Sequence, residues 1–133
     1  MTQEIKEIEN FDDIKLLVDV FYGKIKEDKL LKDIFNMIIQ DRWPQHMETM
    51  YSFWQTVLLG ERTYNGAPFI PHAHLPVDKE HFNRWLKLFD ETVDAYFIGE
   101  NATKAKWQAN RMAEMFLHKI EYFRNNSNSI PLM

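Results

Sequence analysis

The chain has 133 residues, a formal net charge of -4 and no cysteine. This length suits one domain with a single core, and the acidic balance offers no basic surface for nucleic acid. The absence of cysteine excludes disulfides, thiolate catalysis and cysteine-bound metal clusters, which leaves histidine as the obvious ligand for a soft metal. The polar N-terminal segment contains no secretory signal, and no apolar stretch approaches the roughly 18 to 20 residues of a membrane span. We therefore expect a soluble, cytoplasmic protein.

Helical periodicity begins after Asn10, which is a suitable N-cap residue. The first predicted helix carries an apolar stripe at helical spacing, formed by Ile14, Leu17, Val18, Phe21 and Ile25. Tyr22 falls on the edge of this stripe, so its ring can be buried while its hydroxyl faces whatever the helix covers. Gly23 beside it is a poor helix former, which indicates a close approach by another segment.

Two further helices are predicted before the middle of the chain. The apolar residues of the shorter one are Leu30, Leu31, Ile34, Phe35 and Ile38. The longer one opens at Asp41, accepts Pro44 in its first turn and ends at Gly60. Its apolar face is formed by Trp43, Met47, Met50, Trp54, Val57 and Leu58. His46 lies one turn before Met50, on this face or at its border.

Residues 61–77 show neither helical nor strand periodicity. A loop of roughly this length inside a compact domain is usually functional or disordered. Disorder fits poorly, because the loop has apolar side chains to bury at Phe69, Ile70, Leu75 and Val77. Prolines at positions 68, 71 and 76 also lower the entropy that is lost when the loop becomes ordered. We therefore expect His72 and His74 to be held in an ordered loop.

Two more helices complete the predicted fold. The fourth begins at Asp78, which can act as an N-cap, and Gly99 stops it. Its apolar residues are Phe82, Trp85, Leu86, Phe89, Val93 and Tyr96. A fifth helix runs from about Asn101 to Arg124. No segment alternates with period two, and no repeat or linker is visible, so the sequence predicts one all-α domain over residues 1–133, with its core at about 11–124 and a flexible tail at 125–133.

The five histidines are the residues most suited to cofactor chemistry. His72 and His74 could form a two-residue metal fork, but that spacing turns both rings to one side only in a strand. His81 and His118 lie near helix ends, where solvent exposure explains them. An axial haem ligand needs one neutral imidazole, apolar walls and a second polar group across the ring face. A histidine on the ordered loop and another on a facing helix would meet that need.

A plainer interpretation also accounts for the same side chains. Tyr22, His46 and Trp85 are equally compatible with core packing, with their polar tips at the rim of the core. The pattern of residues alone leaves these two interpretations open.

Several separated motifs, in a single order, resemble those of truncated haemoglobins. They are Phe21-Tyr22, Trp43-Pro44-Gln45-His46 followed by Phe53-Trp54, Tyr64-Asn65-Gly66, His72-Ala73-His74-Leu75-Pro76-Val77 and His81-Phe82-Asn83-Arg84-Trp85-Leu86. The similarity spans about residues 14–123, and the ordered set is more specific than any single motif. Within the family, the chain most resembles the third group, which pairs a distal histidine with a distal tryptophan.

The resemblance implies a shortened globin, with two helices stacked over two others around one b-type haem. It implies His72 as the proximal iron ligand, with Tyr22, His46 and Trp85 on the distal side. The apolar walls would come from Phe35, Met50 and Phe53. His74 is the alternative proximal ligand, because a shift in register would exchange it with His72. Arg42, Arg62, Tyr64 and several lysines are all candidates for holding the haem propionates.

The implied function is the binding of O2, NO or CO at one pentacoordinate iron. Hydrogen bonds from Tyr22 and Trp85 would hold O2 too firmly for transport. They favour redox chemistry of O2, NO or peroxide instead, as in an NO dioxygenase or a peroxidase-like enzyme, with His46 as proton shuttle or gate and an unidentified electron donor. Two other classes stay open: a zinc hydrolase using His72, His74, His81 and Asp78, and a helical interaction module with no cofactor.

Overall fold

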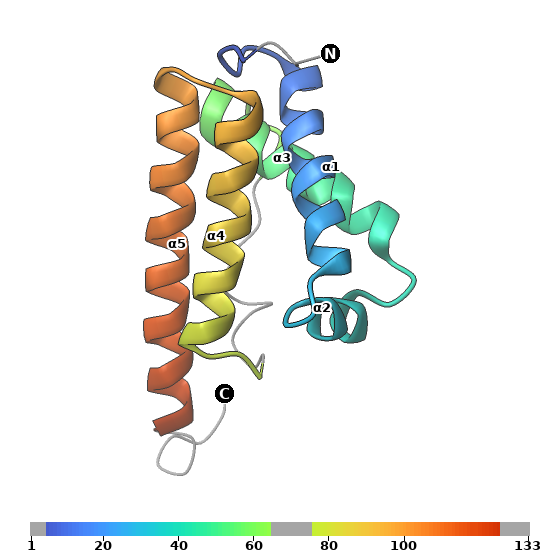
Figure 1. Cartoon of the computed structure of the whole chain (residues 1–133), viewed down its shortest axis with the longest axis vertical. Coiled ribbons are helices and arrows are strands. Elements are labelled where there is room, and N and C mark those ends of the chain that lie inside the picture. Colours follow the sequence, from blue (N-terminus) through green and yellow to red (C-terminus); the bar gives the residue numbers. More distant parts are fainter. Residues whose placement is uncertain (1–4, 65–75, 126–133) are drawn as a thin grey trace.

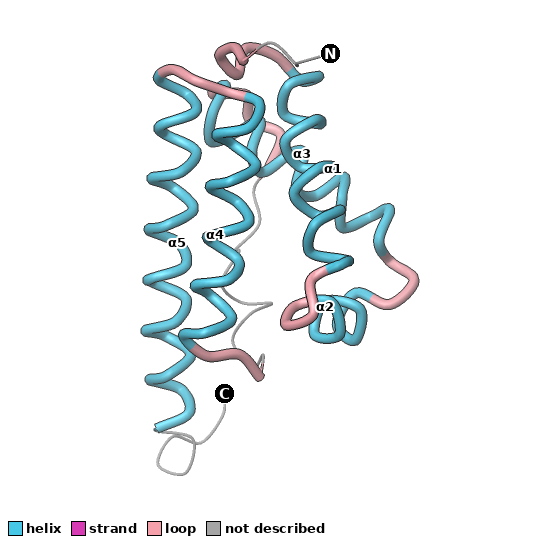
Figure 2. Tube along the Cα trace, in the orientation of Figure 1, coloured by secondary structure: helices cyan, strands magenta, loops and turns pink. Residues whose placement is uncertain are grey.

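The structure is a computed structural model, and it describes residues 5–64 and 76–125. Its helices are α1 (Phe11–Glu27), α2 (Lys32–Ile39), α3 (Trp43–Leu59), α4 (Lys79–Tyr96) and α5 (Glu100–Asn125). Figure 1 shows α4 and α5 side by side, with α1 next to α4 and α3 crossing behind α1. The described residues form helices and connecting loops without a β-strand, as Figure 2 shows, which confirms the predicted all-α class. No helix among them is long and apolar enough to cross a membrane.

Capping residues explain where most of these helices begin and end. The Asn10 side chain accepts a hydrogen bond from the backbone N–H of Asp13 (3.1 Å) at the start of α1. Gly60 ends α3 in the left-handed conformation with φ 73°. Asp78 caps α4, as predicted, by accepting a hydrogen bond from the N–H of Glu80 over 3.2 Å.

Two predicted helix ends are wrong by a few residues. The N-cap of α3 is Arg42 and not Asp41, so this helix begins at Trp43 without a side-chain cap. The end of α4 is Tyr96, because Phe97 is extended, and Gly99 lies beyond the helix in the connection to α5. The prediction placed both boundaries at the nearest residue with suitable capping chemistry, which locates a helix end only to within a few residues.

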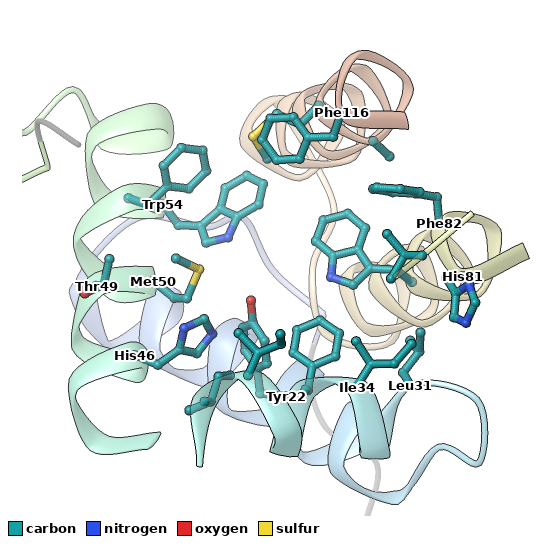
Figure 3. A pocket seen from close by; sticks show the side chains of 18 of the residues that line it. Tyr22, Leu31, Ile34, His46, Thr49, Met50, Trp54, His81, Phe82 and Phe116 are labelled. Carbon is teal, nitrogen blue, oxygen red and sulfur yellow. The ribbon is translucent and has the colours of Figure 1, made fainter. Parts of the chain in front are cut away.

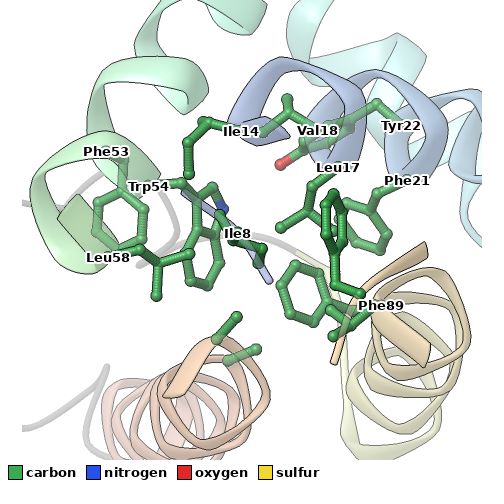
Figure 4. Packing of buried hydrophobic residues seen from close by; sticks show 14 of the residues in the cluster. Ile8, Ile14, Leu17, Val18, Phe21, Tyr22, Phe53, Trp54, Leu58 and Phe89 are labelled. Carbon is green, nitrogen blue, oxygen red and sulfur yellow. The ribbon is translucent and has the colours of Figure 1, made fainter. Parts of the chain in front are cut away.

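The hydrophobic core is centred on α1, whose buried residues include Ile14, Leu17, Val18, Phe21 and Ile25. Figure 4 shows Phe21 and Phe89 packed beneath α1, with Trp54 arriving from α3. The ring of Phe89 stacks on Trp54 at 5.1 Å and meets Phe21 edge-on at 5.1 Å. The buried face of α5 carries alanines at positions 102, 105, 109 and 113, whose small side chains allow neighbouring helices to approach closely.

Residues 6–8, which precede α1, contact the start of both α1 and α5 through polar side chains. Oε1 of Glu7 accepts hydrogen bonds from the backbone N–H groups of Asn101 (3.0 Å) and Ala102 (3.2 Å), and so caps α5. The Asn101 side-chain amide donates to the carbonyl of Ile8 over 2.8 Å. Lys6 pairs with Asp13 of α1 over 2.6 Å. A carboxylate remote in sequence thus replaces a local N-cap residue for α5.

A substitution at Gly99 tests the cap that Glu7 provides for α5. The φ of Gly99 is 121°, and a Cβ at this position would collide with the Glu7 carboxylate. We expect Gly99→Ala to lower the free energy of unfolding by about 1–3 kcal/mol, because the alanine is strained and also displaces the cap. Chemical denaturation measures this change.

Gly23→Ala is the matched control. Contrary to the prediction of a close approach, nothing lies within 4 Å of a Cβ placed at this helical position. The control should raise stability by about 0.5–1 kcal/mol. Equal effects of the two substitutions would contradict the proposed cap.

Candidate functional site

All five helices contribute side chains to one cavity of about 280 Å³. Figure 3 shows α3 on the left of the cavity, α2 along its lower edge, and α4 and α5 on the right. Its wall is mainly aliphatic and aromatic, and α2 contributes Ile34, Phe35, Ile38 and Ile39. Its lining is predominantly apolar, so a flat apolar ligand would lose contact with water on binding there.

The structure brings most of the predicted site residues together in the wall of this cavity. Six of them line it: Tyr22, Phe35, His46, Met50, Phe53 and Trp85. The predicted proximal ligand His72 and its alternative His74 lie outside the described residues. The roles assigned to all of these side chains therefore stay predictions, whereas the proximity of the six is a property of the structure.

Tyr22 supplies a polar tip to this apolar wall. The residue is 5 % exposed, and Figure 3 shows its hydroxyl pointing from α1 into the cavity. Burial raises the pKa of the phenol well above its ordinary value, because desolvation disfavours the phenolate. Tyr22 thus stays protonated at neutral pH and can donate a hydrogen bond into the cavity.

His46 lies next to Tyr22 on the same side of the cavity. It comes from the first turn of α3, and its ring meets that of Tyr22 edge-on, with centroids 5.0 Å apart and an angle of 87° between planes. Its Nε2 atom is buried. Figure 3 shows the ring between Tyr22 and Met50 at the cavity edge. An imidazole in this place can exchange a proton with a ligand in the cavity.

Trp85 enters the wall from α4 and is held by the core behind it. Its indole stacks on Phe89, one turn later in α4, at 5.6 Å with an angle of 6°, and it meets Phe21 edge-on at 5.2 Å. Such contacts restrict a large ring to one orientation. Trp85 lines the same cavity as Tyr22, and its indole has one N–H donor.

His81 helps to cap the start of α4. Its Nδ1 accepts a hydrogen bond from the backbone N–H of Asp78 over 3.1 Å, which completes a capping box at the start of α4. The prediction that exposure alone accounts for His81 is therefore wrong. Within residues 5–64 and 76–125, no group of three or more acidic or histidine side chains is placed to hold a metal ion.

The cavity also has lining residues that were not predicted as parts of its wall. Trp54, predicted on the apolar face of its helix, is 3 % exposed and lines the cavity, and Met112 and Phe116 extend the wall from α5. Their spacing of four residues marks them as one helix face, but nothing in the sequence relates that face to Tyr22. Tyr64 and Val77, which flank residues 65–76, line the cavity as well.

The fold and the cavity together define a small all-α protein built to enclose an apolar ligand beside a few polar tips. A family model described as bacterial-like globin matches residues 7–120. The group 3 truncated hemoglobin of Campylobacter jejuni is 36% identical over 115 residues, which cover 84% of this chain and 91% of that protein. The crystal structure of the group III truncated hemoglobin from C. jejuni superposes with a TM-score of 0.78 at 34% identity, covering 90% of this chain and 95% of the other.

The chain belongs to the bacterial-like globin family. Within this family it is a truncated haemoglobin, and it most resembles group III. It is therefore a haem-binding globin, and the predicted family and fold class are confirmed. Membership of this family favours haem over the zinc hydrolase and over the cofactor-free module. Globins in general bind small diatomic ligands.

Tyr22→Phe tests the burial of the phenol. The ordinary tyrosine pKa is 10.0, and burial raises that of Tyr22 above it. The buried phenol therefore contributes stability that is complete below the unfolded pKa and is lost as pH rises above about 10. Burial also raises the pKa of Tyr51 and Tyr64. We expect an alkaline absorbance titration of the folded protein to show a delayed tyrosinate phase beyond those of Tyr51 and Tyr64, and Tyr22→Phe should remove this phase. The variant should also lose less stability above that pH.

Tyr122→Phe, which changes a side chain that is 53% exposed, is the control for this titration. It should leave both the delayed phase and the alkaline stability as they are in the unaltered protein. If Tyr22→Phe titrates like the unaltered protein, the phenol is not buried as described.

Proposed function

We propose that the cavity holds one haem b with His72 as the proximal iron ligand. When bound, haem b supplies an iron that binds O2, NO or CO and exchanges electrons with the ligand. The apolar wall fits the flat face of a porphyrin, and the polar tips of Tyr22, His46 and Trp85 fit a small polar ligand. Haem b needs no cysteine for attachment, which agrees with a chain that has none.

The two ends of the segment that contains His72 support this assignment. Tyr64 precedes the segment and lines the cavity, and its backbone N–H donates to Oγ1 of Thr56 on α3 over 3.0 Å. Val77 follows the segment, lines the cavity, and accepts a hydrogen bond from the guanidinium of Arg124 on α5. The chain thus enters and leaves this segment beside the cavity.

Tyr22 and Trp85 would donate hydrogen bonds to the ligand. A phenol and an indole N–H are both donors at neutral pH, and in an apolar cavity their hydrogen bonds are stronger than in water. These bonds would favour O2, which gains negative charge on binding, over CO. Binding of this kind is too tight for transport, so we infer redox chemistry of O2, NO or peroxide.

His46 would act as the proton shuttle or the gate for this chemistry. Its ring contacts Tyr22 at 5.0 Å and lies at the cavity edge, where a proton can pass between the ligand and water. Such redox chemistry would also require an electron donor as a partner of the protein. We also propose that the protein is cytoplasmic and that residues 1–133 form one globin domain.

Among the candidates for holding the propionates, Tyr64 has the best support. Its side chain lines the cavity, whereas the guanidinium of Arg42 donates to the carbonyls of Ile38 and Ile39. Burial raises the pKa of the Tyr64 phenol, which therefore remains a hydrogen-bond donor.

The proximal assignment makes a spectral prediction. Protein purified with haem should show a strong Soret band, and His72→Ala should abolish or greatly weaken it, because the iron loses its protein ligand. His74→Ala is the matched control and should keep the band. An unchanged band in His72→Ala, or a loss confined to His74→Ala, would remove His72 from the proximal position.

The distal assignment makes a kinetic prediction. Tyr22→Phe and Trp85→Phe should each speed O2 dissociation by about tenfold, since a hydrogen bond to a partly charged acceptor contributes about 1.5 kcal/mol. Stopped-flow release of O2 measures the rates. Tyr122→Phe and Trp107→Phe, at side chains that are 53% and 57% exposed, are the controls. Rates equal to those of the unaltered protein in both pocket variants would show that neither side chain donates to O2.

A further inference from the structure

Trp43 is a half-buried tryptophan at the first position of α3, outside the lining of the cavity. Its ring meets Tyr22 edge-on, with centroids 6.1 Å apart and an angle of 68°, and meets His46 edge-on at 5.6 Å and 89°. Tyr22 and His46 contact each other at 5.0 Å. Each of these three rings therefore contacts the other two, and Trp43 is the one farthest from the ligand space.

Polar contacts hold the Trp43 indole from two other helices. Its Nε1–H donates to Oδ1 of Asn36 on α2 over 3.2 Å. Nζ of Lys26 on α1 lies 4.3 Å from the ring centroid, where an ammonium group is attracted to the indole face. The ring thus belongs to α3 but is positioned by α1 and α2.

The corner between α2 and α3 fixes the backbone that carries this ring. Gln40 has a left-handed φ of 56°, which turns the chain sharply after α2. The guanidinium of Arg42 then donates to the carbonyls of Ile38 (2.6 Å) and Ile39 (3.3 Å). These carbonyls have no partner within the helix, so the arginine closes the end of α2 directly beside Trp43.

We propose that Trp43 is a positioning residue that keeps the Tyr22 and His46 side chains turned into the cavity. A histidine in the first turn of a helix can rotate toward solvent, and the edge of the Trp43 ring occupies part of the space it would sweep. The same ring supports the outer side of Tyr22. This inference deepens the proposed function and rests on the roles given there to Tyr22 and His46.

Trp43→Leu in the haem-loaded protein under CO is the main test. We expect the C–O stretching band to broaden or split, because His46 and Tyr22 gain a second orientation near the ligand. O2 dissociation should accelerate by about two- to tenfold, the effect of losing aromatic contacts of this strength. Trp43→Phe keeps an aromatic edge and should restore most of the band shape. A band and rate equal to those of the unaltered protein in Trp43→Leu would overturn the proposal.

The matched control is Trp107→Leu. Trp107 is 57% exposed and also has a cation over its ring, because Arg111 lies 5.3 Å from the centroid. Removing it deletes an indole and a cation–π contact of the same kind on a helix face remote from Tyr22. The control should leave the C–O band and the O2 rate unchanged. Equal shifts in both variants would mean that Trp43 has only a general structural effect.

Two further variants keep the test decisive if Trp43→Leu does not fold. Asn36→Ala removes the acceptor of the indole N–H and leaves every ring in place, so it should shift the C–O band in the same direction by a smaller amount. In a His46→Ala background, Asn36→Ala should lose the part of its effect that acts through His46. An unchanged band in Asn36→Ala, or an effect of Asn36→Ala that is undiminished in the His46→Ala background, would contradict positioning.

NMR of the purified protein separates failure of this inference from failure of the proposed function. Cross-peaks between the ring protons of Tyr22 and His46 report their contact whether or not the sample carries haem. Protein that takes up no haem would overturn the proposed function, and Trp43→Leu should still weaken these cross-peaks. Cross-peaks that keep their intensity in Trp43→Leu would overturn the inference even in a sample loaded with haem.

Discussion

The structure depends on the way α1 separates the core from the cavity. Phe21 and Tyr22 are neighbours in sequence, but the first packs on Phe89 in the core and the second directs its hydroxyl into the cavity. Successive residues of a helix point about 100° apart, so one helix serves both sides only if its register is held. The capped start at Asn10 and the buried stripe of α1 hold that register.

The same separation explains how polar groups can remain in an apolar site. Burial of a hydroxyl or an indole N–H without a partner is costly, and in the proposed function a ligand would supply the acceptor for these groups. The aromatic contacts behind the cavity hold these donors in place: Phe21 and Phe89 support Trp85, and Trp43 supports Tyr22. A cavity shaped before the ligand arrives loses little freedom on binding it.

The sequence predicted the helices well because apolar spacing and capping are local. Asn10, Gly60 and Asp78 end or begin helices where their chemistry indicates. The cavity residues of α1, α3 and α4 were found through ordered motifs, since periodicity alone did not separate ligand-facing rings from core rings. Contacts between remote segments had no local signal: the Glu7 cap of α5 crosses 94 positions, and the α5 part of the wall depends on how that helix packs.

Anomalous diffraction from crystals of the haem-loaded protein would show whether the cavity beside Tyr22 is the haem site. Data collected on either side of the iron absorption edge locate the metal without reference to any side chain. We expect one iron peak per chain inside the cavity, facing the Tyr22 hydroxyl. An iron peak at the protein surface, or anywhere outside this cavity, would show that the haem binds elsewhere.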